Sequence, residues 1–266
     1  LPISNITPSD MMTVLSKIWV DKPDTAKKIR QRLRAVIKWA RAQGHFTGDD
    51  PVEIAEAALP KVKNKANHFK SAPFANIPAI FRQVEQSSLF PSTKLAVQFL
   101  ILTACRTTEV REATWKEIDL EQKLWCIPAE RMKTGSPHNV PLSIKALDIL
   151  KKAEELQTDN DLIFPSPVNN AALSSNALLH ALQKRLKIDA TIHGMRSSFK
   201  DWTSETTNYS NEVSEMALAH IVSNKVEGAY RRGDLSEKRR SLMQDWSNFV
   251  TSSEEKTVQV LRKTTS

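Results

Sequence analysis

The segment from Ser92 to Cys105 constrains the fold of this 266-residue chain most strongly, because apolar residues fill almost every position along it. Its large apolar side chains are Leu95, Val97, Phe99, Leu100, Ile101 and Leu102. In a helix these side chains surround the axis, and such a helix is stable in water only inside a larger core. No stretch of the chain reaches the roughly 18 uncharged apolar residues that a membrane span requires. We therefore expect a buried central helix in a globular domain without membrane contact.

The two cysteines and the amino-terminal residues indicate a cytoplasmic protein. Cys105 and Cys126 form no Cys-x-x-Cys pair and have no histidine cluster beside them, so neither a metal site nor a disulfide framework is expected. The first residues, LPISNITPSD, lack the basic and apolar segments of a secretory signal.

Positive charge is concentrated near the amino terminus. The formal net charge is +8, and residues 1–70 hold 13 Lys and Arg against 7 Asp and Glu, so six of the eight net charges lie there. This balance favours a polyanionic partner, although many basic proteins never bind nucleic acid.

A helix is predicted from Asp24 to Ala42, with Asp24 as its cap and Gly44 just after its end. Its apolar face consists of Ile29, Leu33, Val36, Ile37 and Ala40. Beside that face, basic residues recur at steps of three and four, namely Lys27, Arg30, Arg34, Lys38 and Arg41. They form either a solvated helix face or a stripe that follows DNA phosphates, and the sequence leaves both interpretations open.

The segment KVKNKANHFK, residues 61–70, contains four lysines, no acidic residue and little periodicity. These features predict an exposed linker, whose Lys61, Lys63 and Lys65 are candidates to lie along a DNA backbone. We expect a helical DNA-binding domain over residues 1–60, the linker over 61–72 and a second domain over 73–266.

The second domain is predicted to be mainly helical with a small antiparallel β-sheet. Short strands are expected over Leu124–Pro128 and Asn139–Leu142, with a turn at 133–137 between them. Helical patterns cover Ile144–Leu156, Ser174–Leu186, Arg196–Thr206, Glu212–Ala219, Lys225–Tyr230 and Ser236–Phe249. The fold class is therefore mainly α, with a helical domain followed by a mixed α+β domain.

Common catalytic motifs are missing from the sequence. Only six glycines occur, without a phosphate-binding glycine-rich loop, and there is no His-Glu-x-x-His motif or serine nucleophile elbow. Several residues that can bind or attack a phosphate follow one another along the chain, in the order Arg106, Lys133, His193, Arg196, His220 and Tyr230.

Four segments that contain these residues resemble the sequence motifs of the tyrosine recombinase (phage integrase) family. They are ACRTTEVREATW (104–115), RMKTGSPHNVPLS (131–143), IHGMRSSF (192–199) and LAHIVSNKVEGAY (218–230). One such motif alone is weak evidence, because an Arg-x-x-Glu on a helix is usually a local salt bridge. Their common order extends the resemblance over residues 73–250, and the whole is most similar to prophage and genomic-island integrases.

The sequence departs from the family pattern in three places. Thr108 and Ala219 stand where many relatives have glycine, and ten residues rather than nine separate His220 from Tyr230. We interpret these differences as variation within the family.

The resemblance implies that Tyr230 attacks a DNA phosphate and forms a 3′-phosphotyrosyl link, so neither a cofactor nor ATP is expected. Arg106 and Arg196 are the candidates for a clamp on the phosphate, because a guanidinium stays charged and offers parallel N–H donors to the oxygens that gain charge in the transition state.

The remaining site residues receive supporting roles from the same resemblance. Lys133 would protonate the departing 5′-oxygen, and His193 would act as acid and base beside the tyrosine. His220 would donate to a phosphate oxygen, and Glu109 would orient Arg106. Isolated histidines more often satisfy structural hydrogen bonds, and structural support is also the default interpretation of Glu109.

The expected function is site-specific DNA recombination that integrates or excises a mobile element. The partners implied are double-stranded attachment sites, a homotetramer assembled on DNA from free monomers, and a DNA-bending accessory protein. Relatives of this kind also carry an amino-terminal arm-site domain, which this sequence does not contain, so we expect it to be part of a longer protein.

Two other functions stay open from the sequence. A type IB topoisomerase has the same nucleophile and clamp, but is not expected to need the helix Ser236–Phe249, which we expect to dock on a neighbouring protomer. A DNA-binding module without catalysis has no use for Tyr230.

Overall fold

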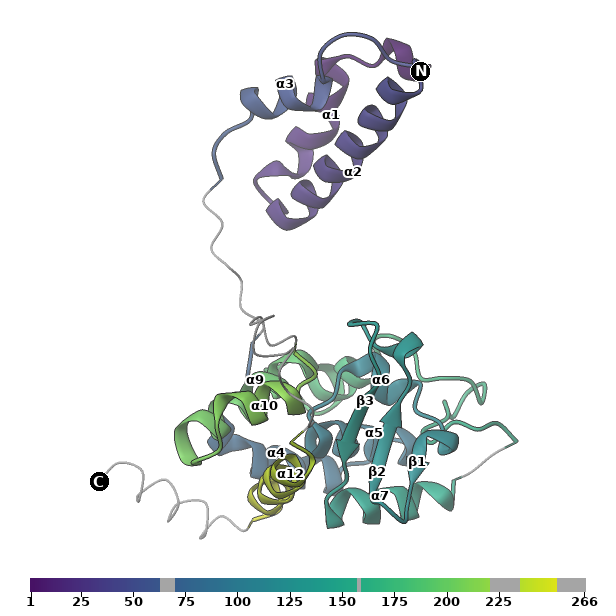
Figure 1. Ribbon diagram of the computed structural model, residues 1–266, viewed down its shortest axis with the longest axis vertical. Helices are drawn as coiled ribbons and strands as arrows, with labels where there is room; N and C mark the ends of the chain where they lie inside the picture. Colours follow the sequence, from purple (N-terminus) through teal and green to yellow (C-terminus); the bar gives the residue numbers. More distant parts are fainter. Residues whose placement is uncertain (63–69, 157–158, 221–234, 253–266) are drawn as a thin grey trace. The chain divides into compact units, whose positions relative to one another are not determined.

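The computed structural model describes residues 1–62, 70–156, 159–220 and 235–252 of the chain. The chain divides into two compact units, Leu1–His68 and Phe69–Ser266, which we describe separately (Figure 1). None of the helices within the described ranges combines the length and apolar character needed to cross a bilayer.

Over residues 1–62, the first unit contains three α-helices that follow a short 3-10 helix, η1 (Ile3–Asn5). They are α1 (Pro8–Trp19), α2 (Pro23–Ala42) and α3 (Pro51–Ala58). Each begins with a proline, whose missing N–H is not needed in the first turn. A small core holds them together, formed by Met11, Ile37, Ala40, Phe46, Val52 and Ala55.

The predicted helix over 24–42 is confirmed as α2, with two corrections. Its N-cap is Lys22 and no side chain caps it, so the assignment of Asp24 as the cap was wrong. Val36 is 52% exposed, so it does not belong to the buried face. Gly44 follows the helix with a φ of +74°, a conformation that favours glycine.

The second unit contains most of the helices and the sheet. Its α-helices are α4 (Ile77–Gln86), α5 (Pro91–Thr103), α6 (Thr107–Arg111), α7 (Ile144–Glu154), α8 (Ala177–His180), α9 (Ile192–Thr206), α10 (Asn211–Ala217) and α12 (Ser236–Val250). Shorter helical turns are η2 (Phe74–Asn76), η3 (Trp115–Glu117), η4 (Ala129–Arg131) and η5 (Ala181–Arg185).

The buried central helix expected from the sequence is α5. All of its residues after Pro91 are buried except Lys94, and it packs against α4, α7 and α12. Its length and all-round burial confirm the prediction from the apolar segment, and the helix is the centre of a core that extends through the whole second unit.

A three-stranded antiparallel sheet lies beside α5, in the order β1 (Ile118–Asp119), β2 (Leu124–Ile127) and β3 (His138–Pro141). Trp125 of β2 pairs with Val140 of β3, and both side chains are buried. The two predicted strands are confirmed. The prediction missed β1, which has only two residues and therefore shows no alternation.

The carboxy-terminal helix α12 packs into its own unit. Figure 1 shows it in yellow beside α4, and it also contacts α5, α7 and β3. Leu242, Met243, Trp246 and Val250 are buried, and the Trp246 indole N–H donates to the Ile101 carbonyl at 2.8 Å. The apolar face of this helix is therefore covered within its own unit, and its docking on a neighbouring protomer stays a prediction.

Two helical segments differ from their predicted bounds by more than two residues. The pattern over 174–186 becomes a short α-helix, α8, followed by the π-helical turn η5. Helix α9 starts four residues earlier than expected, because the Thr191 hydroxyl caps it by accepting the Gly194 N–H at 2.9 Å. This earlier start places His193 on the same helix as Arg196.

Residues 70–72 hold the amino-terminal end of α9. The Lys70 carbonyl accepts the Thr191 N–H at 2.9 Å, and the Ala72 carbonyl accepts the Ser198 hydroxyl. Gly194 permits this contact, since a Cβ at that position would lie 2.2 Å from the Lys70 carbonyl oxygen.

We expect Gly194→Ala to destabilise the second unit by about 1–3 kcal/mol, because backbone atoms must move to admit the methyl group. In a unit of this size, each kcal/mol lowers the thermal midpoint by about 2–4 °C. Thermal denaturation checks this, with Ser204→Ala at an exposed position of α9 as the control. An unchanged midpoint in Gly194→Ala would show that the close contact is not required.

Candidate active site

Arg106 lies between the end of α5 and the start of α6. The chain leaves α5 through Ala104, which has a φ of +50°, and Arg106 is the N-cap of α6. The buried carboxylate of Glu109 accepts the Arg106 backbone N–H at 2.7 Å and its Nη1 at 2.8 Å. Nη2 of Arg106 donates to the Ala219 carbonyl at 3.3 Å. The guanidinium is therefore fixed at both ends and remains partly exposed.

Arg196 lies on α9 and is only 4% exposed. Its Nη1 donates to the Ala104 carbonyl, and its Nη2 donates to the Leu218 carbonyl at 2.6 Å. Nη2 also lies 3.3 Å from Nε2 of His220. Burial lowers the pKa of Arg196, but an arginine side chain remains charged in proteins. The two arginines thus bind neighbouring carbonyls of the segment 218–220.

His220 follows α10 after a left-handed residue, Ala219, with a φ of +49°. Its backbone N–H donates to the Glu215 carbonyl at 3.0 Å, and its Nδ1 lies 2.7 Å from Oε2 of Glu215. These contacts direct Nε2 towards Arg196. The side chain is 43% exposed, so it can reach a bound molecule.

His193 is surrounded by cations. Partial burial is the largest cause that lowers its pKa, and the charges of Arg196, Arg106, His220 and Lys133 lower it further. Lys133 is exposed in the turn between β2 and β3. The ring of His193 is therefore neutral at pH 7, the protonation state from which an imidazole can act as a base.

The structure thus brings together five of the six predicted catalytic residues and the supporting Glu109. The sixth, Tyr230, lies outside the described residues.

The predicted DNA-binding residues of the first unit divide into two groups. Arg30 pairs with Glu56, and Arg34 lies 3.3 Å from Glu53. The other three residues of the predicted stripe are exposed, namely Lys27, Lys38 and Arg41. Of the linker lysines, Lys61 is exposed, while Lys63 and Lys65 lie outside the described residues.

Sequence analysis missed a pair of residues behind His220. The Nζ of Lys200, on α9, lies 2.7 Å from Oε1 of Glu215, on α10. Lys200 stands four residues after Arg196, so helical spacing could have placed both on one face. The partner Glu215 was unpredictable without the packing of α9 on α10.

His138 was also missed. It is 8% exposed at the start of β3, and burial, followed by the charge of Arg239, lowers its pKa to about 4. A neutral His138 therefore lies beside the cations of the site. A pocket of about 310 Å³ opens there, lined by His138, His220, Arg239 and parts of the 134–137 turn.

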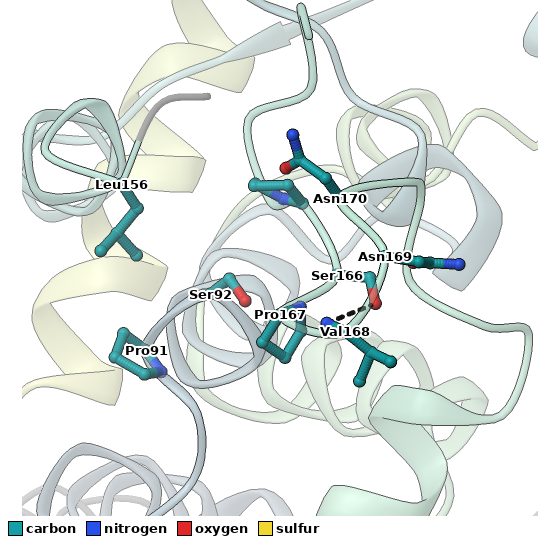
Figure 2. Close-up of a pocket in the computed structure, with 9 residues that line it drawn as sticks. Pro91, Ser92, Leu156, Ser166, Pro167, Val168, Asn169 and Asn170 are labelled. Atoms are coloured by element: carbon teal, nitrogen blue, oxygen red, sulfur yellow. Dashed lines mark hydrogen bonds between the residues drawn. The ribbon is translucent and has the colours of Figure 1, made fainter. Parts of the chain in front are cut away.

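A second pocket, of about 390 Å³, lies apart from this cluster, between Pro91, Leu156 and the 165–170 loop (Figure 2). Ser166 accepts the Val168 N–H within that loop. Its described lining contains no ionisable side chain, so it offers no acid or base. Within the described ranges, no three His, Cys, Asp or Glu side chains are arranged to hold a metal ion.

The cluster around Arg106 and Arg196 is suited to a phosphate group. Two guanidiniums are fixed beside the segment 218–220, and their charges and that of Lys133 act on the neutral ring of His193. Because the donors are already in position, they can stabilise charge that develops during a reaction without reorganising.

Known proteins are similar to this chain in sequence and in fold. Residues 72–237 match the Phage integrase family, and residues 1–57 match the Phage integrase central domain. The prophage integrase IntZ of Escherichia coli K12 is 32% identical over 94% of this chain and 61% of its own length. The chain spans about three-fifths of the length of the curated relatives it matches.

Solved structures of lambda integrase share the fold. A dimer of its residues 75–356 bound to a COC′ core site has a TM-score of 0.60 at 23% identity, covering 88% of this chain and 82% of the other. A tetramer bound to a Holliday junction has a TM-score of 0.61 at 22% identity, covering 85% and 65%. Because the family match covers more than half of the residues and includes all six predicted catalytic positions, this chain belongs to the phage integrase family.

Proposed function

We propose that this chain is the part of a site-specific tyrosine recombinase that cleaves and rejoins DNA, with Tyr230 as its nucleophile. One observation carries the proposal: Arg106, Arg196 and His220 are linked through the segment 218–220, with His193 and Lys133 close by. Such a cluster matches the charge of a phosphodiester. The segment that follows His220 in the sequence contains Tyr230.

In the proposed reaction, the Tyr230 phenol oxygen attacks the phosphorus while the bond to the 5′-oxygen breaks. His193 accepts the phenol proton, for which its lowered pKa leaves it neutral. Lys133 donates a proton to the departing 5′-oxygen, and Arg106 and Arg196 stabilise the charge on the phosphate oxygens. A 5′-hydroxyl reverses the same steps, so the energy of the phosphodiester is retained without ATP.

We further propose that the substrate consists of double-stranded attachment sites of a mobile element, and that four protomers assemble on them in the bacterial cytoplasm. Solved structures of lambda integrase, as a dimer on a core site and as a tetramer on a Holliday junction, support this assembly. A DNA-bending accessory protein belongs to the same proposal. Residues 1–60 are the core-type DNA-binding domain, 61–72 the linker and 73–266 the catalytic domain.

A suicide DNA substrate distinguishes the proposed covalent cleavage from DNA binding without catalysis. On a duplex nicked near the cleavage site, the short leaving strand diffuses away, so a recombinase stays covalently attached. We expect an adduct that resists denaturant and forms in excess chelator, because guanidiniums supply the electrostatic role that a metal has in other phosphoryl-transfer enzymes. Strand exchange between two duplexes then distinguishes a recombinase from a topoisomerase, which only relaxes one supercoiled molecule.

The first unit is proposed to contact DNA phosphates through the exposed Lys27, Lys38 and Arg41. Each phosphate contact contributes a slope of about −0.9 to log affinity against log salt, so changing all three to Gln should flatten the slope by up to about 2.7. Arg30→Gln is the matched control, since its guanidinium is paired with Glu56. Fluorescence titrations at several salt concentrations measure the slope for the triple variant and for the control. An unchanged slope in the triple variant would mean that these three residues form a solvated helix face and do not contact phosphates.

A further inference from the structure

His220 is held by a carboxylate that lies on the side of the ring away from Arg196. Nδ1 is 2.7 Å from Oε2 of Glu215, and Nε2 is 3.3 Å from Nη2 of Arg196. A carboxylate only accepts and a guanidinium only donates. The neutral ring therefore carries its proton on Nδ1 and accepts from Arg196 through Nε2.

Lys200 in turn holds Glu215. Its ammonium group lies 2.7 Å from Oε1 of Glu215, and it donates to Asn211 Oδ1 and Ser214 Oγ, each at 2.5 Å. Three acceptors match the three N–H bonds of an ammonium group. Burial raises the pKa of Glu215, but hydrogen bonds from Lys200 and His220 outweigh it and the net shift is downwards, so the carboxylate is charged at pH 7.

We propose that Glu215 and Lys200 are positioning residues, which fix the tautomer of His220 and direct its Nε2 towards the phosphate-binding arginines. The chain of contacts runs from α9 to α10 and back to Arg196 on α9, so both helices contribute to the orientation of one ring. Without the acceptor at Nδ1, the ring can rotate and exchange tautomers. Nε2 then accepts from Arg196 only part of the time, and the Arg196 guanidinium is held less firmly.

The expected effect on the rate of adduct formation rests on the proposed function. The expected tautomer of His220 does not. The tautomer of His220 is a property of the free protein, and it can be measured without DNA. The rate of covalent adduct formation adds a second, independent readout.

The first experiment is ¹⁵N NMR of histidine-labelled free protein, with His220 assigned through His220→Asn. In spectra recorded over a series of pH values, we expect the neutral ring to give two separate ring resonances with the proton on Nδ1. Glu215→Ala should move this pattern towards the other tautomer or an average, while Glu215→Gln should preserve it in part, because its one amide oxygen must serve both His220 and Lys200. Unchanged resonances in Glu215→Ala would overturn the proposal.

The second experiment measures adduct formation on suicide DNA at saturating concentration. Glu215→Ala should slow the rate about tenfold with DNA affinity within about twofold, since one hydrogen bond to a charged group is lost. Glu215→Gln should recover part of the rate, because its amide oxygen can still accept from Nδ1 of His220. As a single substitution, Lys200→Met should slow adduct formation. Combined with Glu215→Ala it should slow the reaction no further, because Lys200 acts through the Glu215 carboxylate.

Glu205→Ala, which removes an exposed carboxylate from α9, is the matched control and should react like the unaltered chain. Equal rates for Glu215→Ala and this control would overturn the positioning role. Failure of the unaltered chain to form any adduct would instead overturn the proposed function, and the tautomer measurement would then decide the inference by itself.

Discussion

Replacing Tyr230 with phenylalanine is expected to abolish the covalent protein–DNA adduct while DNA affinity changes by less than about twofold. The substitution removes only the phenol oxygen, which is the proposed nucleophile, and the phosphate contacts of the arginines do not depend on it. Denaturing gel electrophoresis of suicide-duplex reactions measures the adduct, and a filter or fluorescence titration measures the affinity.

Tyr209→Phe is the matched control, because these are the two tyrosines of the sequence. The Tyr209 hydroxyl donates to Asp245 at 2.7 Å, and burial together with that carboxylate raises its pKa to about 12. A phenol held protonated in this way is a poor nucleophile. Tyr209→Phe should therefore lower stability by about 1 kcal/mol and leave adduct formation intact. An adduct that persists in Tyr230→Phe but disappears in Tyr209→Phe would reverse the assignment.

Arg106→Lys is expected to slow DNA cleavage about a hundredfold or more, with a much smaller effect on binding. The Arg106 guanidinium bonds to Glu109 and Ala219 and still presents donors to a phosphate. A single ammonium group cannot reproduce this two-pronged geometry. Loss of one transition-state donor costs on the order of 3 kcal/mol, which corresponds to that change in rate. Single-turnover cleavage at saturating DNA gives the rate directly.

Arg111→Lys provides the control on the same helix. Arg111 donates to the Leu173 carbonyl and to Glu112, neither of which is a site residue. Its replacement should therefore affect stability more than the rate of cleavage. A variant Arg106→Lys that weakens binding and cleavage in equal proportion would mean that Arg106 contacts the phosphate only in the ground state. Arg196 is a less direct test, because its buried guanidinium also holds the Ala104 and Leu218 carbonyls.

Several elements were predictable because their signals are local. The all-round apolar pattern of α5 requires burial whatever surrounds it, and the strands β2 and β3 flank a turn that contains Gly135 at a φ of +68°. The sequence motifs around Arg106, Arg196 and His220 likewise indicated residues that the fold brings together. Each of these features depends on neighbours within a few positions along the chain.

Other features depend on contacts between distant segments. Arg30 pairs with Glu56 and so differs from the exposed basic residues of α2. No pattern within α2 reveals this pair, because Glu56 lies on α3. Glu215 acquires its role from the packing of α10 on α9. The inward packing of α12 through Trp246 was not predicted, because an amphipathic pattern does not say which surface covers the apolar face.

The central claim is that Tyr230 becomes covalently joined to DNA, and peptide mapping of the trapped complex tests it most directly. The chain is reacted with a nicked attachment-site duplex in excess chelator, the adduct is digested with trypsin and nuclease, and the modified peptide is sequenced by mass spectrometry. We predict a nucleotide joined through its 3′-phosphate to Tyr230. A nucleotide attached to another residue, joined through a 5′-phosphate, or formed only when magnesium is supplied would contradict the account.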